Sequence, residues 1–202
     1  MPKHPLTAVR DRSVLVVLDL HGRLQENVLD QDVVATNAVA VARIAAIAKI
    51  PILLTEQNPK ALGHTLPQVR AALPGAPVLD KMAFSAFGEP AFVRALAGLG
   101  RAHLVVCGIM THVCVCQTAL DAIAAGHTVH VVGDAVSCWK ESDHHAGLEK
   151  MRQAGAVIGT AELIAYEWLE RAGTEEFRAA LPWLKKKDPA PMLSLPAHPA
   201  HG

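Results

Sequence analysis

The chain has 202 residues, 51% of them apolar, which is enough for one domain with a substantial hydrophobic core. Its 19 Lys and Arg residues balance its 19 Asp and Glu residues, so no basic surface is available for nucleic acid or an anionic membrane, and a small molecule is the expected partner. No apolar stretch approaches the roughly 18 residues of a membrane-spanning helix, and residues 1–12 lack the apolar centre of a signal peptide, so we expect a cytoplasmic protein.

Short runs of Val, Ile and Leu, without polar alternation, alternate along the chain with segments of helical periodicity. Such runs are typical of strands buried on both faces of a parallel sheet. We predict strands over residues 13–19, 51–55, 77–80, 103–109, 128–133 and 156–159. Helices are predicted over residues 32–48, 89–98, 112–125, 142–154, 161–172 and 174–181. The pattern predicts a three-layer α/β/α fold with a mostly parallel six-stranded sheet.

Residues 1–187 are expected to form one domain, because no internal repeat or domain-scale linker interrupts them. Residues 188–202 are a nearly charge-free tail in which four prolines prevent a continuous helix. We expect this tail to be extended or disordered unless something holds it. Its apolar residues Met192, Leu193 and Leu195 are predicted to dock on a neighbouring subunit of a homo-oligomer.

Three of the predicted strands are followed by ionisable or nucleophilic side chains. The first runs into Asp19, the third into Lys81, and the fourth into a segment that contains Cys114. In open α/β sheets, ligands bind outside the carboxyl ends of the strands, where the strand order reverses. We therefore expect an acid, an amine and a thiol to meet at one edge of the sheet.

Cys114 is the candidate nucleophile of this set. With Thr111 as the N-cap, Cys114 would fall in the first turn of a helix, where unpaired N–H groups lower the pKa of a thiol and favour the thiolate. The alternative is a buried structural cysteine, which is common for a free thiol. The four cysteines, Cys107, Cys114, Cys116 and Cys138, have no framework spacing and are expected to be reduced.

Asp19 and Lys81 are the candidate partners of the thiol. A carboxylate that follows a long apolar run enters a poorly solvated place and needs a partner. Lys81 beside it would keep the carboxylate ionised and favour the thiolate electrostatically. The alternatives are that Asp19 braces the turn at Gly22 and that Lys81 is a solvated cation at a strand end.

Motifs spread over roughly residues 12–185 resemble the isochorismatase-like cysteine hydrolases, and most closely the isochorismatase-domain proteins of that group. They include Val-Leu-Asp19, Thr55-Glu-Gln57, Gly63-His-Thr65, Lys81-Met-Ala-Phe84-Ser85-Ala-Phe87, Cys107-Gly-Ile-Met-Thr-His-Val-Cys114 and Asp134-Ala-Val-Ser137. The resemblance implies a Rossmann-like fold and a catalytic triad of Asp19, Lys81 and Cys114. It also implies a cis peptide bond between Ile109 and Met110, with the backbone N–H groups of Met110 and Cys114 as an oxyanion hole.

Neither a metal nor a cofactor is expected. Nicotinamidase-like relatives hold an ion with an Asp-x-His pair, but this chain reads Thr55-Glu-Gln-Asn-Pro59 after its second predicted strand. A zinc site at His112, Cys114 and Cys116 is disfavoured because it lacks a second ligand pair and would occupy the proposed nucleophile. His144 and His145 are expected at the surface.

Six residues are predicted to border a substrate pocket because they fall in strand-end loops or in the motifs above. They are His21, Gln57, His64, Phe84, Ser85 and Trp139. His21 and Arg23 stand where the resemblance would place Gln and Glu, so the relatives do not identify the substrate.

These residues together predict a cysteine hydrolase that cleaves a C–N bond of a small amide through a thioester intermediate. A first alternative is vinyl-ether hydrolysis of the isochorismatase type, which needs the Asp but no nucleophilic Cys. A second alternative is a catalytically silent binding or scaffold protein with the same fold. The presence of all three triad residues disfavours both.

Overall fold

The computed structural model describes residues 3–73 and 75–185, and within them six strands form a sheet in the order β3-β2-β1-β4-β5-β6. The strands are β1 (Ser13–Leu18), β2 (Ile52–Gln57), β3 (Val78–Lys81), β4 (His103–Ile109), β5 (Thr128–Ser137) and β6 (Val157–Gly159). Every neighbouring pair in this sheet is parallel. The strand order reverses beside β1, so β1 and β4 lie at the centre.

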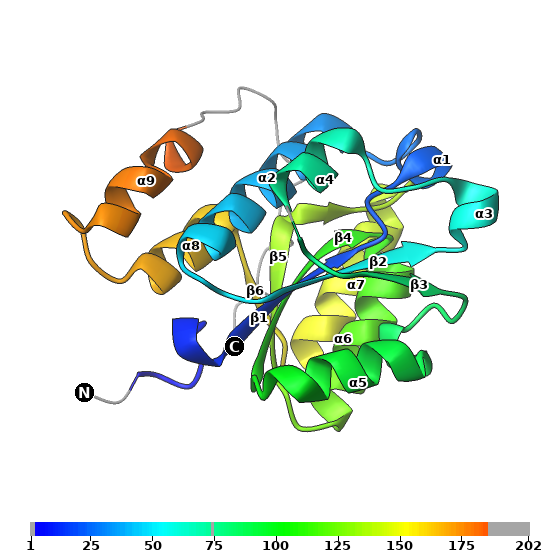
Figure 1. Ribbon diagram of the computed structural model, residues 1–202. Helices are drawn as coiled ribbons and strands as arrows, with labels where there is room; N and C mark the ends of the chain where they lie inside the picture. The colour runs from blue at the N-terminus through cyan, green and yellow to red at the C-terminus, as the bar shows by residue number, and fades with distance from the viewer. Residues whose placement is uncertain (1–2, 74, 186–202) are drawn as a thin grey trace.

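Helices cover both faces of the sheet (Figure 1). The α-helices are α1 (Gly22–Gln25), α2 (Gln31–Ile47), α3 (Pro59–Leu62), α4 (Pro67–Ala72), α5 (Pro90–Leu99), α6 (Cys116–Ala124), α7 (Glu141–Gln153), α8 (Ala161–Leu169) and α9 (Glu175–Leu184). Two short 3-10 helices, η1 (Arg10–Arg12) and η2 (Ala86–Gly88), and a π-helix, η3 (Thr111–Val115), complete the described elements. Helices α2, α4, α8 and α9 pack on one face, and α5, α6 and α7 pack on the other.

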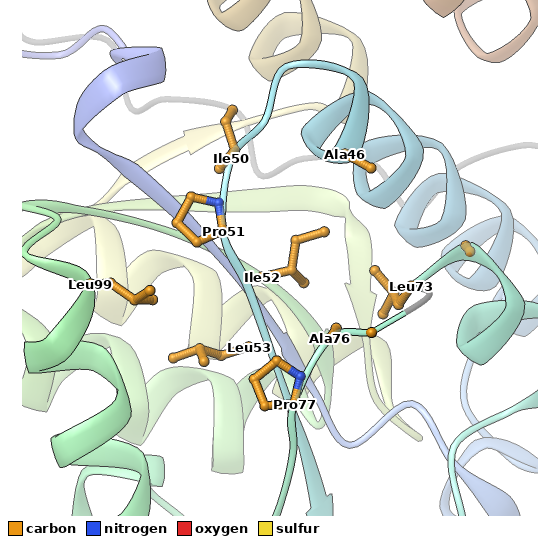
Figure 2. Close-up of a pocket in the computed structure, with 11 residues that line it drawn as sticks. Ala46, Ile50, Pro51, Ile52, Leu53, Leu73, Ala76, Pro77 and Leu99 are labelled. Carbon is orange, nitrogen blue, oxygen red and sulfur yellow. The ribbon is translucent and has the colours of Figure 1, made fainter.

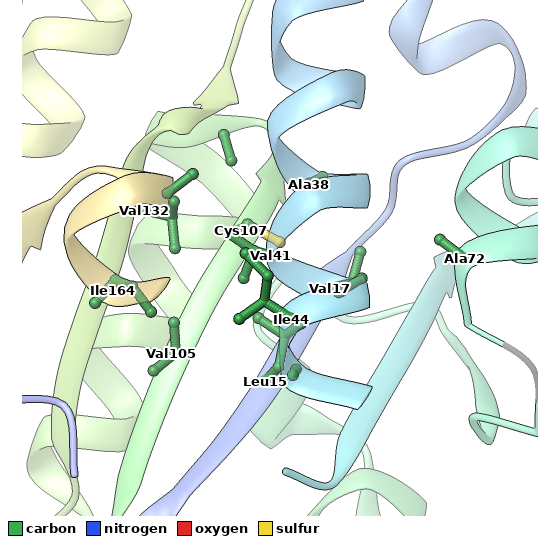
Figure 3. Close-up of a cluster of buried hydrophobic side chains, with 14 of the residues drawn as sticks. Leu15, Val17, Ala38, Val41, Ile44, Ala72, Val105, Cys107, Val132 and Ile164 are labelled. Atoms are coloured by element: carbon green, nitrogen blue, oxygen red, sulfur yellow. The ribbon is translucent and has the colours of Figure 1, made fainter. Parts of the chain in front are cut away.

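The central strands are apolar on both sides because each side faces a different layer of helices. On β1, Leu15 and Val17 pack toward α2, while Val14, Val16 and Leu18 belong to the core on the opposite face. Figure 3 shows Leu15 and Val17 among side chains of α2, β4 and α8. Each fully buried Leu or Val contributes roughly 1.5–3 kcal/mol. This two-sided burial explains why the sequence lacks polar alternation.

The structure confirms the predicted α/β/α fold and sharpens it, because the sheet is wholly parallel within the described residues. The predicted fifth strand, residues 128–133, is too short. β5 extends to Ser137 because a register shift against β4 lies between Val106 and Gly108 and allows pairing to resume. The predicted helix over residues 161–172 is too long, because Glu170 adopts a positive φ of 57° and ends α8.

Several short elements were not predicted. Helices α1, α3 and α4 each have six residues or fewer, too few to show helical periodicity in the sequence. Among the described residues, no helix is long and apolar enough to cross a membrane. The predicted tail, residues 188–202, lies outside the described residues, and so do its proposed anchors Met192, Leu193 and Leu195.

Candidate active site

Asp19, Lys81 and Cys114 lie at the carboxyl edge of the sheet, each on a different strand or the segment that follows it. Asp19 comes directly after β1, Lys81 ends β3, and Cys114 lies in η3, after β4. The backbone at Asp19 has a φ of 56°, in the left-handed region that few residues other than glycine adopt. Its N–H donates to Thr55 O at 3.2 Å, and its carbonyl accepts from His21 N–H at 2.8 Å. These two bonds hold the sharp turn that ends β1.

Asp19 and Lys81 form a buried ion pair. Lys81 Nζ lies 2.9 Å from Asp19 Oδ2, and both side chains are at most 1% exposed. Asp19 Oδ2 has no hydrogen-bond partner among the described residues, so its contact with Lys81 is an ion pair. The other carboxylate oxygen, Oδ1, accepts a 2.7 Å hydrogen bond from Thr55 Oγ1. Removing either charge would leave the other buried without a counter-charge, which makes the pair strongly interdependent.

Lys81 also donates to three neutral oxygens. Its Nζ lies 2.5 Å from Gln57 Oε1, 3.0 Å from Phe84 O and 3.2 Å from Ala83 O. The loop that supplies the two carbonyl groups is tied down by Glu89, whose Oε1 accepts from the backbone N–H groups of Met82 at 2.7 Å and Ala83 at 2.9 Å. The ammonium group is therefore held in one position by β2, β1 and this loop.

Cys114 is 4% exposed, and its Sγ lies 4.0 Å from Gln57 Oε1. The pKa of the Cys114 thiol is raised to about 11, chiefly by burial and then by the Asp19 charge, while the Lys81 charge opposes this increase. Hydrogen bonding to Asp19 favours the neutral thiol and hydrogen bonding to Lys81 favours the thiolate. The thiol is therefore close enough to the ion pair for both of its members to shift the pKa.

The prediction that a helix N-terminus lowers the pKa of the Cys114 thiol is wrong. Burial outweighs the nearby cation, so the thiol is protonated at neutral pH. Thr111 is not an N-cap, because Met110 takes that position and the Thr111 hydroxyl lies 3.0 Å from His144 Nδ1. The predicted helix over residues 112–125 is also divided, into the π-helix η3 and then α6.

The peptide bond between Ile109 and Met110 is cis. Just before it, Gly108 has a φ of 123°, and a Cβ atom at this position would overlap the carbonyl oxygen of Leu18. Only glycine allows β4 to approach β1 this closely, next to the turn at Asp19. The Met110 carbonyl accepts from the N–H groups of Val113 at 3.0 Å and Val115 at 3.2 Å, which fixes the start of the segment that carries Cys114.

The structure brings one predicted pocket residue, Gln57, into contact with the triad. His21 is completely buried behind it, and His21 Nε2 accepts a 2.9 Å hydrogen bond from the Gln57 backbone N–H. Burial lowers the pKa of His21, although the Asp19 charge opposes this effect. His21 therefore supports the end of β2.

The other predicted pocket residues do not touch the triad through their side chains. His64 is exposed and pairs with Glu56 at 2.9 Å, and the Ser85 hydroxyl donates to Asp121 Oδ2 at 2.6 Å. The side chains of Phe84 and Trp139 are more than half exposed near the carboxyl ends of β3 and β5. Ser85 is therefore a structural link between the loop after β3 and helix α6.

Two features of the site were not predicted. Thr55 contacts the Asp19 carboxylate, and the strand-end rule that selected Asp19 could have selected Thr55 as well, because it lies near the end of β2. His144 was expected at the surface but is completely buried, because α7 packs it against Thr111. Among the described residues, no three His, Cys, Asp or Glu side chains gather as a metal site.

A cavity of about 250 Å³ borders Lys81. It is lined by Asn58, Pro59, Lys60, Asp80, Lys81, Met82 and Glu89. A larger cavity of about 360 Å³ lies at the opposite edge of the sheet, near the start of β2 (Figure 2). Its lining has no titratable side chain, and it includes Ile50, Pro51, Ile52, Leu73 and Leu99. Of these two cavities, the smaller one is therefore on the side of the sheet that carries Asp19, Lys81 and Cys114.

Comparisons with known proteins identify the family of the chain. Residues 13–162 match the family described as the isochorismatase domain. The chain is 33% identical over 187 residues to isochorismatase domain-containing protein 2A of Mus musculus, covering 92% of this chain and 89% of that protein. This match extends the similarity beyond the domain itself.

Solved structures share the fold. A structure described as the MAR1 ribonuclease of Caenorhabditis elegans has a TM-score of 0.87 and 31% identity, covering 96% of this chain and 100% of that chain. The ycaC gene product of Escherichia coli, described as an octameric hydrolase of unknown specificity, has a TM-score of 0.82 and 26% identity, covering 91% and 93%. The chain belongs to the isochorismatase family, and this membership supports a hydrolase function.

Proposed function

We propose that the chain is a cysteine hydrolase that cleaves a C–N bond of a small amide-type substrate through a thioester intermediate. The observation that carries this proposal is the buried Asp19–Lys81 ion pair at 2.9 Å, with the buried Cys114 thiol close enough that both charges shift its pKa. A nucleophile, a base and a cation at one strand edge are the parts that acyl transfer requires. The neutral overall charge favours a small substrate over a polyanion such as RNA.

The raised pKa of Cys114 defines what the base must do. Because the thiol is protonated at neutral pH, attack on a carbonyl requires that its proton leave as the sulfur–carbon bond forms. Asp19 is the acceptor in this proposal, and Lys81 balances the negative charge as it moves from the carboxylate to the sulfur and then to the substrate oxygen. The backbone N–H groups of Met110 and Cys114 are proposed to stabilise that oxyanion, where one such donor is typically worth roughly 3–4 kcal/mol.

The second half of the reaction returns the site to its first state. Asp19 gives its proton to the departing amine as the C–N bond breaks, which leaves the acyl group on Cys114 as a thioester. Water then attacks the thioester carbon while Asp19 accepts a proton from this water. The bond between carbon and sulfur breaks, the carboxylic acid leaves, and Asp19 passes its proton to the Cys114 sulfur, which restores the thiol and the carboxylate. One amide and one water are consumed, and one amine and one acid are formed, so no cofactor or metal is needed.

We further propose that the enzyme works as a homo-oligomer, by analogy with the E. coli neighbour that is described as octameric. The exposed apolar side chains of Met82 and Phe84, in the loop that holds Lys81, could contact an apolar part of a substrate or a second subunit. A cytoplasmic location and a domain boundary at residue 187 stay predictions.

The test is a panel of small amides and carbamoyl compounds, assayed for release of ammonia or amine. We expect the wild-type chain to turn over at least one compound, the Cys114→Ser variant to turn over none, and the acyl-enzyme to appear as a mass increase on the peptide that contains Cys114. Cys116→Ser is the matched control, since Cys116 is also buried and lies two residues away. Cleavage of a vinyl ether by Cys114→Ser would favour the ether-hydrolase alternative, and inactivity throughout would favour a scaffold.

A further inference from the structure

The side chain of Gln57 is fixed at both ends of its amide group. Its Oε1 accepts from Lys81 Nζ at 2.5 Å, and its Nε2 donates to Met82 O at 3.0 Å. A rotated amide would place its NH₂ group against the ammonium group and its oxygen against the Met82 carbonyl, so the hydrogen-bond network allows one orientation. The strand register adds to this, because Gln57 on β2 pairs directly with Lys81 on β3.

The same amide oxygen also faces the nucleophile. Cys114 Sγ lies 4.0 Å from Gln57 Oε1, within the range of a sulfur hydrogen bond, and Gln57 is only 8% exposed. On the other side, the Gln57 backbone N–H is held by His21 Nε2 at 2.9 Å. One neutral oxygen is therefore held between the catalytic cation and the thiol, in a place from which it cannot easily move.

The position of the Gln57 amide oxygen has two electrostatic consequences, and both favour the protonated form of the Cys114 thiol. A hydrogen bond from the thiol to Gln57 stabilises the protonated form and so disfavours the thiolate. The short contact with Lys81 also occupies one of the three ammonium protons, which would otherwise be available to the sulfur. Both effects keep Cys114 protonated while no substrate is present.

We propose that Gln57 is a further catalytic residue, whose amide oxygen restrains Cys114 by accepting from its thiol and by competing with the sulfur for Lys81. This inference rests on the proposed function, because it assumes that Cys114 is the nucleophile. When the thiol proton moves to Asp19, Lys81 shifts one N–H from Gln57 Oε1 to the sulfur, and no atom is gained or lost at Gln57. The residue thus sets how readily the thiolate forms.

The experiment compares the alkylation rates of Cys114 in three variants, measured with iodoacetamide between pH 7 and 9 and located by mass spectrometry. Gln57→Glu places a carboxylate beside the sulfur and should slow alkylation about tenfold or more, which corresponds to one pKa unit. Gln57→Met keeps the length of the side chain but removes the acceptor, so it should accelerate alkylation several-fold. Gln117→Glu, which adds the same charge on the exposed face of α6, should alkylate like the wild-type chain.

Opposite shifts for Gln57→Glu and Gln57→Met support the proposal, because a merely structural residue would change both rates in the same direction. Unchanged rates, or two shifts of the same sign, would overturn it. Thermal unfolding monitors whether each variant folds, and if Gln57→Glu does not fold, the sign of the Gln57→Met shift alone decides. Failure of this inference leaves the proposed function intact, since that function is tested separately by turnover in Cys114→Ser.

Discussion

At the scale of single residues, the candidate site contains two buried charges that neutralise each other. Asp19 and Lys81 are buried together, and neutral oxygens from Gln57, Ala83 and Phe84 complete the surroundings of the ammonium group. Such pairs add little net stability compared with apolar residues, but breaking one of them is costly. Net stability therefore does not explain the pair, which is consistent with the catalytic role proposed above.

Asp19→Asn is expected to reduce turnover of the amide substrate by about a hundredfold or more, because an amide side chain cannot accept the thiol proton. The measurement is the initial rate on a compound identified in the panel. Asp32→Asn, an exposed position in the first turn of α2, is the control and should retain the wild-type rate. Near wild-type turnover by Asp19→Asn would rule out Asp19 as the base.

Lys81→Met should lower the free energy of unfolding by about 3–5 kcal/mol, because it leaves the Asp19 carboxylate buried without its counter-charge. The double variant Asp19→Asn/Lys81→Met removes both charges and should recover most of this loss. Urea unfolding of the wild type and of the single and double variants measures the coupling. If the double variant is less stable than Lys81→Met, the ion pair is not the source of the effect.

At the scale of elements, the sequence predicts which residues lie at the carboxyl edge of the sheet. It does not predict the contacts between them or the pKa of the thiol. A strand that ends on a charged or thiol side chain is visible in the sequence, and this pattern identified Asp19, Lys81 and Cys114. The contact between Gln57 and Lys81 depends on the register of β2 against β3, which periodicity alone does not reveal. The raised pKa of Cys114 depends on how completely η3 is covered, which is a property of packing and not of the local sequence.

Two neighbouring strands carry a buried histidine pair. His103 on β4 and His130 on β5 stack with their ring centroids 5.5 Å apart, and both ring nitrogens of His130 are buried without a hydrogen-bond partner among the described residues. The pKa of His130 is lowered to about 4, chiefly by burial and also by the neighbouring His103. The folded protein therefore holds this imidazole neutral at pH values where an unfolded chain would protonate it.

The free energy of unfolding should consequently fall as the pH is lowered from about 6.5 toward 4. In this window the unfolded state binds the proton and the folded state does not, so each such histidine contributes a slope of up to about 1.4 kcal/mol per pH unit. Urea unfolding at several pH values measures the slope. His130→Phe should make it shallower, while His4→Phe, at an exposed position, should not. An unchanged slope in His130→Phe would contradict the prediction.

At the scale of the whole molecule, the two helical layers have separate apolar cores on either side of one sheet, and the site lies at the edge where both layers end. This arrangement was predictable from the alternation of apolar runs with helical periodicity. The small helices α1, α3 and α4 were not predictable, because helices this short are unstable alone and depend on contacts such as those of α1 with α3 and of α4 with α2.

Sedimentation should show a homo-oligomer, with a mass that is a multiple of the 21.5 kDa chain. Removal of residues 188–202 is expected to weaken this assembly, because the apolar residues of that segment are predicted to contact a neighbouring subunit. The comparison is between the full chain and a chain that ends at Lys187, each studied over a range of concentrations. A monomeric full chain, or an unchanged dissociation constant after truncation, would contradict the prediction.

The candidate site is assembled from two parts of the chain, one before residue 82 and one after β4. Asp19, Gln57 and Lys81 all lie within residues 13–81. Asp19 follows β1, and the other two end β2 and β3, three strands that are consecutive in the chain and adjacent in the sheet. Cys114 joins them only when β4 pairs with β1, where Ser13 meets His103 across the chain. Non-local pairing of this kind is slow because a long loop must close first. During refolding, enzymatic activity would therefore return later than the spectroscopic signal of the helices. The delay would measure how long β4 takes to pair with β1.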